Sequence, residues 1–230
     1  MANARPTMIG SDSLRPGDSG IPPVTACNLA LALLALPAVA LAAAQFDTTL
    51  GARVELLVEW GIAFAVVGIA LTFEDRSLAD LGLRWPEAVD IAYLVATTAV
   101  IFAVVVGSEP LLRAAGLPVR SGTAGISTTV GLPLALAGAL TTGVVEELLF
   151  RSYPVERLLS LTDSPLVAGG LTWAVFTVAH APAWALGNLL TVAIVAAVLT
   201  AVYLRRRTLV PVAGAHALVW VLAVLGQFYG

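Results

Sequence analysis

The sequence predicts an all-α fold, a polytopic transmembrane bundle of about seven to eight helices. Hydrophobic residues make up 59% of the 230 residues, charged residues only 12%, and the mean hydropathy is +0.92. Ordinary soluble domains do not reach such values, whereas apolar segments of membrane length account for them. The apolar runs are continuous rather than alternating, so the strands of a membrane barrel are not expected.

The apolar runs are organised as one unit after a short tail. Residues 1–25 contain Pro, Gly, Ser and mixed charge without periodicity, which predicts a disordered cytoplasmic tail. Residues 26–230 are expected to form a single membrane-embedded helical domain, because nothing between the runs is long enough for a soluble domain. The runs lie near Cys27–Ala44, Val54–Phe73, Ala88–Gly107, Thr128–Phe150 (amphipathic to about Ser160), Pro165–Ala181, Leu186–Leu204 and Leu209–Phe228. Each approaches the roughly 20 residues that a helix needs to cross the hydrocarbon core, which predicts about seven spans.

The arginines predict the orientation of these spans. With a cytoplasmic tail, that side collects Arg5, Arg15, Arg76, Arg84, Arg151, Arg157, Arg205, Arg206 and Arg207, and the other side holds Arg53, Arg113 and Arg120. The positive-inside rule therefore places the N-terminus in the cytoplasm. Every basic residue is Arg, and Ala, Val, Leu and Gly dominate, which favours a prokaryotic cell membrane as the location.

The composition also limits the classes of function that the protein can have. A net charge of -3 gives no support for nucleic-acid binding. Cys27 is the single cysteine, so an intramolecular disulfide or a two-sulfur site cannot form, and we interpret it as a small apolar residue. Neither a HExxH motif nor a glycine-rich phosphate loop occurs. The expected surroundings are the lipid bilayer.

One stretch, TTGVVEELLFR from Thr141 to Arg151, places charges inside an apolar run. An ionised side chain at the bilayer centre costs roughly 3 kcal/mol, so such residues usually face partners or a water-filled cavity. Glu147 and Arg151 are four residues apart and share a helix face, where they can pair. Glu146 points about 100 degrees away and stays available. A purely structural cluster that holds helices together is the alternative interpretation.

The two histidines, His180 and His216, favour a functional site. If the chain turns back near Asp163, Glu146 and His180 each lie 17 residues from the turn, at the same depth of about 25 Å along antiparallel helices. His216 follows the Arg205–Arg207 anchor at a depth of roughly 13 Å, which is within reach if the helices tilt. A glutamate could then take a proton from water, while neutral imidazoles orient that water or bind a divalent metal.

These motifs resemble a known family. EELLFR (Glu146–Arg151), FTVAH (Phe176–His180) and the segment from Arg205 through Pro211 to His216 together resemble the CPBP family of intramembrane proteases. That family includes CAAX prenyl endopeptidases and bacterial bacteriocin-processing or self-immunity proteins of the Abi type. The resemblance covers about 131–225 and implies a hydrolytic pocket that opens toward the cytoplasm.

The resemblance implies roles for individual residues. Glu146, His180 and His216 would line the active site, and Glu147 and Arg151 would support them. Whether a metal takes part stays open; if one is bound, Zn²⁺ held by Glu146, His180 and His216 is the expectation. We therefore predict an intramembrane endopeptidase of CAAX-protease type, in which Glu146 activates water.

One position departs from the family pattern. Four residues after the third-motif histidine, where the family commonly has asparagine, this chain has Trp220. An indole offers a single N–H donor and cannot ligate a metal through oxygen, although Trp220 could also be an ordinary lipid-facing aromatic. The departure keeps open a non-catalytic immunity or regulatory protein of the same fold. A proton-coupled transporter is a further alternative, although no internal repeat supports it.

Overall fold

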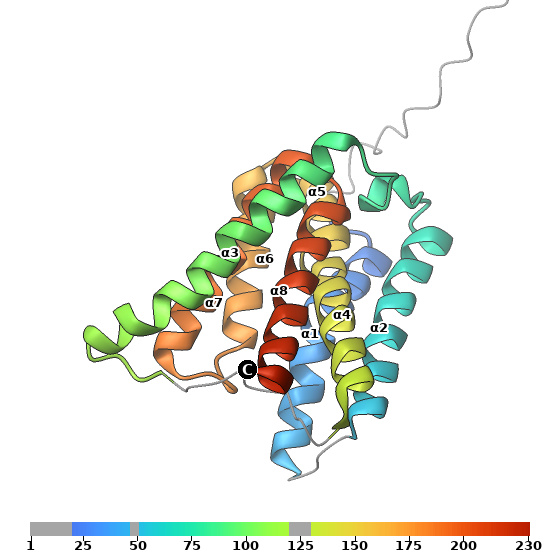
Figure 1. Ribbon diagram of the computed structural model, residues 1–230. Coiled ribbons are helices and arrows are strands. Elements are labelled where there is room, and N and C mark those ends of the chain that lie inside the picture. The colour runs from blue at the N-terminus through green and yellow to red at the C-terminus, as the bar shows by residue number, and fades with distance from the viewer. Residues whose placement is uncertain (1–19, 47–50, 120–129) are drawn as a thin grey trace, which may run out of the picture.

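The structure is a computed structural model that describes residues 20–46, 51–119 and 130–230. In these ranges the chain is helical and contains no strand, which confirms the predicted fold class (Figure 1). The elements are α1 (Pro23–Gln45), α2 (Ala52–Phe73), η1 (Ala79–Leu81), α3 (Ala88–Ala114), α4 (Leu132–Glu147), η3 (Leu148–Ser152), α5 (Tyr153–Thr162), α6 (Pro165–Ala179), α7 (Leu186–Arg206) and α8 (Leu209–Tyr229). Residues 1–19 of the predicted tail, Arg120 and the start of the fourth apolar run lie outside the described residues.

Six segments in the described part of the chain are long and apolar enough to cross a membrane. They are α1, α2, α3, the continuous 31-residue segment Leu132–Thr162, α7 and α8. The seventh predicted span, α6, has 15 residues and is therefore about 22 Å long, short of the ~30 Å hydrocarbon core. The chain leaves the helix at His180, where the sequence pattern suggested continuation to Ala181. The apolar helices make the chain an integral membrane protein.

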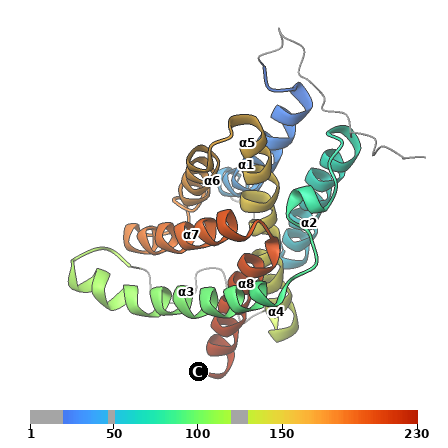
Figure 2. The same ribbon diagram turned by 90° about the horizontal axis from the view of Figure 1, so that it is seen from above.

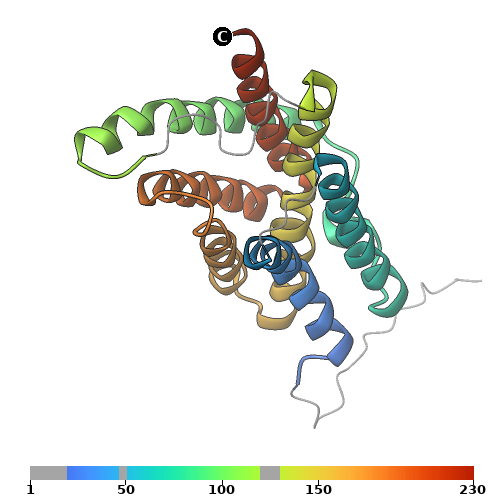
Figure 3. The same cartoon turned by 90° about the horizontal axis from the view of Figure 1, so that it is seen from below.

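The segment α4–η3–α5 lies at the centre of the bundle (Figures 1 and 2). Its middle part, η3, is a π-helix that contacts α1, α2, α6, α7 and α8. All five residues of η3 are buried, which an amphipathic helix on the surface would not show. π-Helical turns are rare and occur frequently at functional sites. Figure 3 shows α3 and α7 side by side, extending away from α4 and α8.

A tight hairpin joins α5 to α6. Asp163 adopts a left-handed conformation with φ of 51° and donates its N–H to the carbonyl of Leu159, which ends α5. The Ser164 hydroxyl then accepts from the N–H of Val167 and caps α6. The hairpin makes the two arms antiparallel, as the predicted turn near Asp163 requires.

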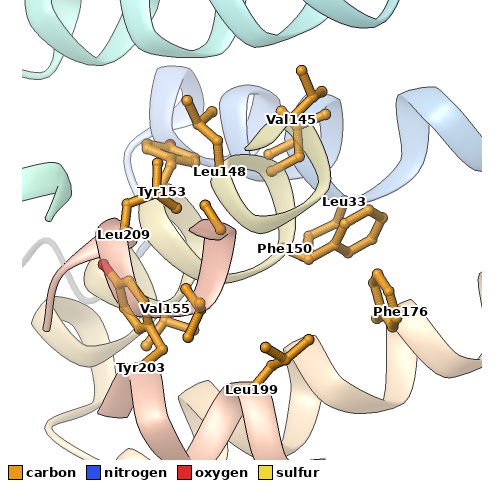
Figure 4. Packing of buried hydrophobic residues seen from close by; sticks show 14 of the residues in the cluster. Leu33, Val145, Leu148, Phe150, Tyr153, Val155, Phe176, Leu199, Tyr203 and Leu209 are labelled. Carbon is orange, nitrogen blue, oxygen red and sulfur yellow. The ribbon is translucent and has the colours of Figure 1, made fainter. Parts of the chain in front are cut away.

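Packing between the two arms sets their register. Phe150 in η3 meets Phe176 in α6 edge to face, with ring centroids 5.1 Å apart (Figure 4). In antiparallel arms, moving four residues back from Phe150 and four residues forward from Phe176 reaches the same level. Glu146 and His180 therefore lie at one depth, as their equal spacing from Asp163 predicts.

One end of the bundle collects most of the arginines. Arg157 on α5 donates to Thr25 at the start of α1 at 2.8 Å and pairs with Glu74 after α2 at 3.1 Å. The ion pairs of this arginine-rich end among the described residues are Arg157–Glu74, Arg84–Glu87, Arg84–Asp90, Arg206–Asp90, Arg206–Glu87 and Arg207–Glu156. The hydrogen bond with Glu156 raises the pKa of the Arg207 guanidinium above its ordinary value. These contacts bring together arginines that the sequence assigned to one side of the membrane.

Candidate active site

A buried ion pair forms the base of the site. Glu147 and Arg151 have fully buried side chains, and Nη1 of Arg151 donates to Oε1 of Glu147 at 2.9 Å. The guanidinium carbon of Arg151 also lies 4.0 Å from the centre of the Phe176 ring. Each charge thus offsets part of the desolvation cost of the other, and the aromatic face adds a cation–π contact. This is the pairing that the four-residue spacing predicts.

His216 on α8 joins this ion pair directly. Its Nδ1 lies 2.9 Å from Oε1 of Glu147, the same oxygen that accepts from Arg151. Its Nε2 accepts a hydrogen bond from the indole Nε1 of Trp220, one helical turn along α8, at 3.0 Å. His216 as a whole residue is 8% exposed. Arg151, Glu147, His216 and Trp220 therefore form one continuous hydrogen-bonded chain.

His180 is held by α6 itself. It follows the last residue of α6, and its Nδ1 lies 2.7 Å from the carbonyl oxygen of Phe176. Because a carbonyl only accepts, Nδ1 carries a hydrogen, and in the neutral imidazole Nε2 then keeps its lone pair. The imidazole also packs against the Phe176 ring, with centroids 4.4 Å apart. The FxxxH spacing thus supplies both an orienting carbonyl and a supporting ring.

A pocket of about 190 Å³ connects the candidate residues. Glu146, His180 and His216 all line it, whereas Glu147 and Arg151 are buried behind its wall. Glu146 is partly buried and has no hydrogen-bond partner among the described residues. The other polar lining residues are Ser108, Glu109, Asn188 and Thr191, and the walls are otherwise largely aliphatic and aromatic. The arrangement joins a carboxylate and an imidazole lone pair in an apolar enclosure.

The pocket lies in the half of the bundle away from the arginine-rich end. Its lining runs from Ile101 to Glu109 on α3 and from Asn188 to Leu199 on α7, and both stretches are distant from Asp90 and Arg206. The arginine distribution predicts that the arginine-rich end is cytoplasmic. The lining therefore extends toward the end of the bundle opposite the arginine-rich end. The opening toward the cytoplasm that the family resemblance implies stays a prediction.

The hydrogen bonds and the placement of the candidate ligands decide whether this site can hold a metal ion. Both ring nitrogens of His216 are engaged, Nδ1 with Glu147 and Nε2 with Trp220, so this histidine has no lone pair for an ion. The described residues contain no group of three or more His, Cys, Asp or Glu side chains placed to hold a metal. Glu146, His180 and His216 as arranged therefore do not fit a Zn²⁺ site.

Sequence reasoning overlooked three contributions to the site. Phe176 belonged to a recognised motif but had no assigned role, although its ring contacts Phe150, Arg151 and His180. Asn188 was overlooked, and an amide within an apolar run was the available signal. The contact from Trp220 to His216 follows from their spacing of one turn, but its direction needed the side-chain rotamers.

Comparison with known proteins bears on this site. Residues 127–222 match the family model described as type II CAAX prenyl endopeptidase, Rce1-like. No curated protein and no solved structure matches the chain. The matched range contains Glu146, Glu147, Arg151, His180 and His216, and it agrees closely with the range of the motif resemblance. Residues 127–222, less than half of the chain, are thus similar to the Rce1-like type II CAAX prenyl endopeptidase family.

Proposed function

We propose that the protein is an intramembrane endopeptidase that hydrolyses a peptide bond with a water molecule activated by Glu146. The observation that carries the proposal is the pocket in which Glu146 and His180 lie at one depth beside His216. The similarity of residues 127–222 to a family of endopeptidases supports the same reaction class. The substrate would be a peptide or membrane protein that enters the pocket within the lipid bilayer.

The chain's own residues can supply the proton transfers. The Glu146 carboxylate takes a proton from water while the water oxygen attacks the peptide carbonyl. The lone pair on Nε2 of His180 accepts the second water hydrogen and orients the molecule, because its Nδ1–H is committed to Phe176. The protonated Glu146 then passes its proton to the leaving nitrogen as the C–N bond breaks. Glu147 contacts His216 on α8 and Arg151 contacts Phe176 on α6, and these contacts fix the position of the helical segment that carries Glu146.

The membrane orientation forms part of the proposal. The arginine-rich end would be cytoplasmic under the positive-inside rule, with the N-terminus on that side. The composition favours a prokaryotic cell membrane. A fusion reporter at either end of the chain measures the orientation directly.

The testing experiment compares peptides of the native host carrying the wild type or Glu146→Gln. We expect cut ends in membrane and secreted peptides that vanish in the variant, which would also identify the substrate. Glu55→Gln is the matched control, because Glu55 is an exposed carboxylate in α2 outside the pocket. Cut ends that persist in Glu146→Gln at equal protein abundance would remove Glu146 from the mechanism.

A second candidate function is a non-catalytic immunity or regulatory protein of the same fold. The observation that favours it is Trp220, whose N–H engages the pocket-lining His216. In that case the pocket would bind a membrane peptide without cutting it. Host protection or regulation that survives Glu146→Gln, with no cut ends in either strain, would support this function.

A further inference from the structure

Trp220 occupies the position at which this chain departs from the third family motif. Its indole Nε1 lies 3.0 Å from Nε2 of His216 and meets the angular requirement for a hydrogen bond. The two residues are one turn apart on α8, so the contact forms within a single helix. Both side chains line the pocket. The departure is therefore part of the site.

The positions of the hydrogens on Trp220 and His216 follow from which of their nitrogens can donate and which can accept. An indole nitrogen only donates, so Nε2 of His216 must carry a lone pair. In a neutral imidazole the hydrogen is then on Nδ1, which lies 2.9 Å from a Glu147 oxygen that only accepts when ionised. The opposite tautomer or the imidazolium would place two N–H groups face to face. One tautomer satisfies both contacts.

The two histidines consequently differ in what they offer the pocket. On His180, Nδ1 is satisfied by the carbonyl of Phe176 in its own helix, and Nε2 keeps a lone pair. On His216, the corresponding Nε2 lone pair accepts from Trp220. Of the two imidazoles, only that of His180 can accept a hydrogen from water in this arrangement.

We propose that Trp220 is a positioning residue that fixes one tautomer of His216 and commits this histidine to Glu147. This inference rests on the proposed function for its catalytic meaning. His216 then belongs to the supporting chain with Glu147 and Arg151, and Glu146 and His180 are the groups that touch the reacting water.

The tautomer is tested by NMR on the full chain in detergent, with histidines labelled with ¹⁵N. His180→Gln assigns the two sets of signals, since the chain has two histidines. We expect His216 to show a protonated Nδ1 and an unprotonated, hydrogen-bonded Nε2, and Trp220→Phe to shift the Nε2 signal. Trp184→Phe, a second indole at the pocket, should leave it unchanged. A protonated Nε2 in the wild type would overturn the proposal.

The NMR measurement needs no substrate, so a failure here is distinct from a failure of the Glu146→Gln cleavage test.

Discussion

Gly143 on α4 lies directly against the backbone of Ala217 on α8. A Cβ built on Gly143 would collide with the backbone nitrogen and Cα of Ala217 and with its Cβ, so only a glycine permits this approach. The contact lies three residues before Glu146 and one residue after His216. Close packing of α4 on α8 is thus what brings His216 within hydrogen-bond distance of Glu147.

Gly143→Ala should therefore separate α4 from α8 and weaken the site. Overpacking usually costs about 1–3 kcal/mol, and rigid backbone on the other side leaves little room for adjustment. We expect a lower thermal unfolding temperature in detergent and loss of the His216–Glu147 hydrogen bond in ¹⁵N spectra.

Gly138→Ala is the matched control on the same helix, because a Cβ there meets nothing within 4 Å. It should be neutral or stabilise the helix by up to about 1 kcal/mol, the propensity difference between Gly and Ala. An equal loss of stability in both variants would show that the close approach to Ala217 is not the cause.

Removing one partner of the buried Glu147–Arg151 ion pair should destabilise the fold strongly, whereas removing the charges of both partners should destabilise it less. Arg151→Met leaves Glu147 charged in a fully buried position, which should destabilise the fold by about 3–5 kcal/mol. Thermal unfolding in detergent measures the loss, and Glu147→Gln in the same chain should restore part of it.

Arg113→Met is the comparison variant, because Arg113 and Glu109 are also four residues apart on one helix. Arg113 pairs with Glu109 at 2.9 Å on α3, but their side chains are 44% and 45% exposed. An exposed pair contributes about 0–1 kcal/mol, so this variant should unfold nearly like the wild type. Similar losses from Arg151→Met and Arg113→Met would contradict a special role for burial.

The sequence predicted the depth of the site residues along their helices better than it predicted which face each helix turns toward its neighbours. Counting residues from Asp163 placed Glu146 opposite His180, because helix rise is nearly constant and the turn was recognisable. The partner of His216 was not predictable, since α8 is apolar on all sides and its sequence does not indicate which face meets α4. Close contact at Gly143 decides that rotation, and it depends on the shape of both helices.

The local irregularities escaped prediction for a related reason. The π-helical turn of η3 buries Leu148 to Ser152 in succession, a pattern that no regular helical period describes. The end of α6 at Ala179 was also missed, because Ala181 continues the apolar run and no glycine marks the boundary. Both irregularities lie beside the candidate residues.

We expect the Phe176 ring to link the Glu147–Arg151 ion pair to His180. Its ring lies 4.0 Å from the guanidinium carbon of Arg151 and 4.4 Å from the centre of the His180 ring. Phe176→Leu keeps an apolar side chain but removes the aromatic face, which should cost about 2 kcal/mol because the guanidinium is desolvated. We expect lower stability in detergent together with lower kcat, since His180 loses its lateral support.

Phe102→Leu, at a 44% exposed position on α3, is the control and should change neither quantity. Full activity in Phe176→Leu despite lower stability would show that the backbone carbonyl alone suffices to orient His180.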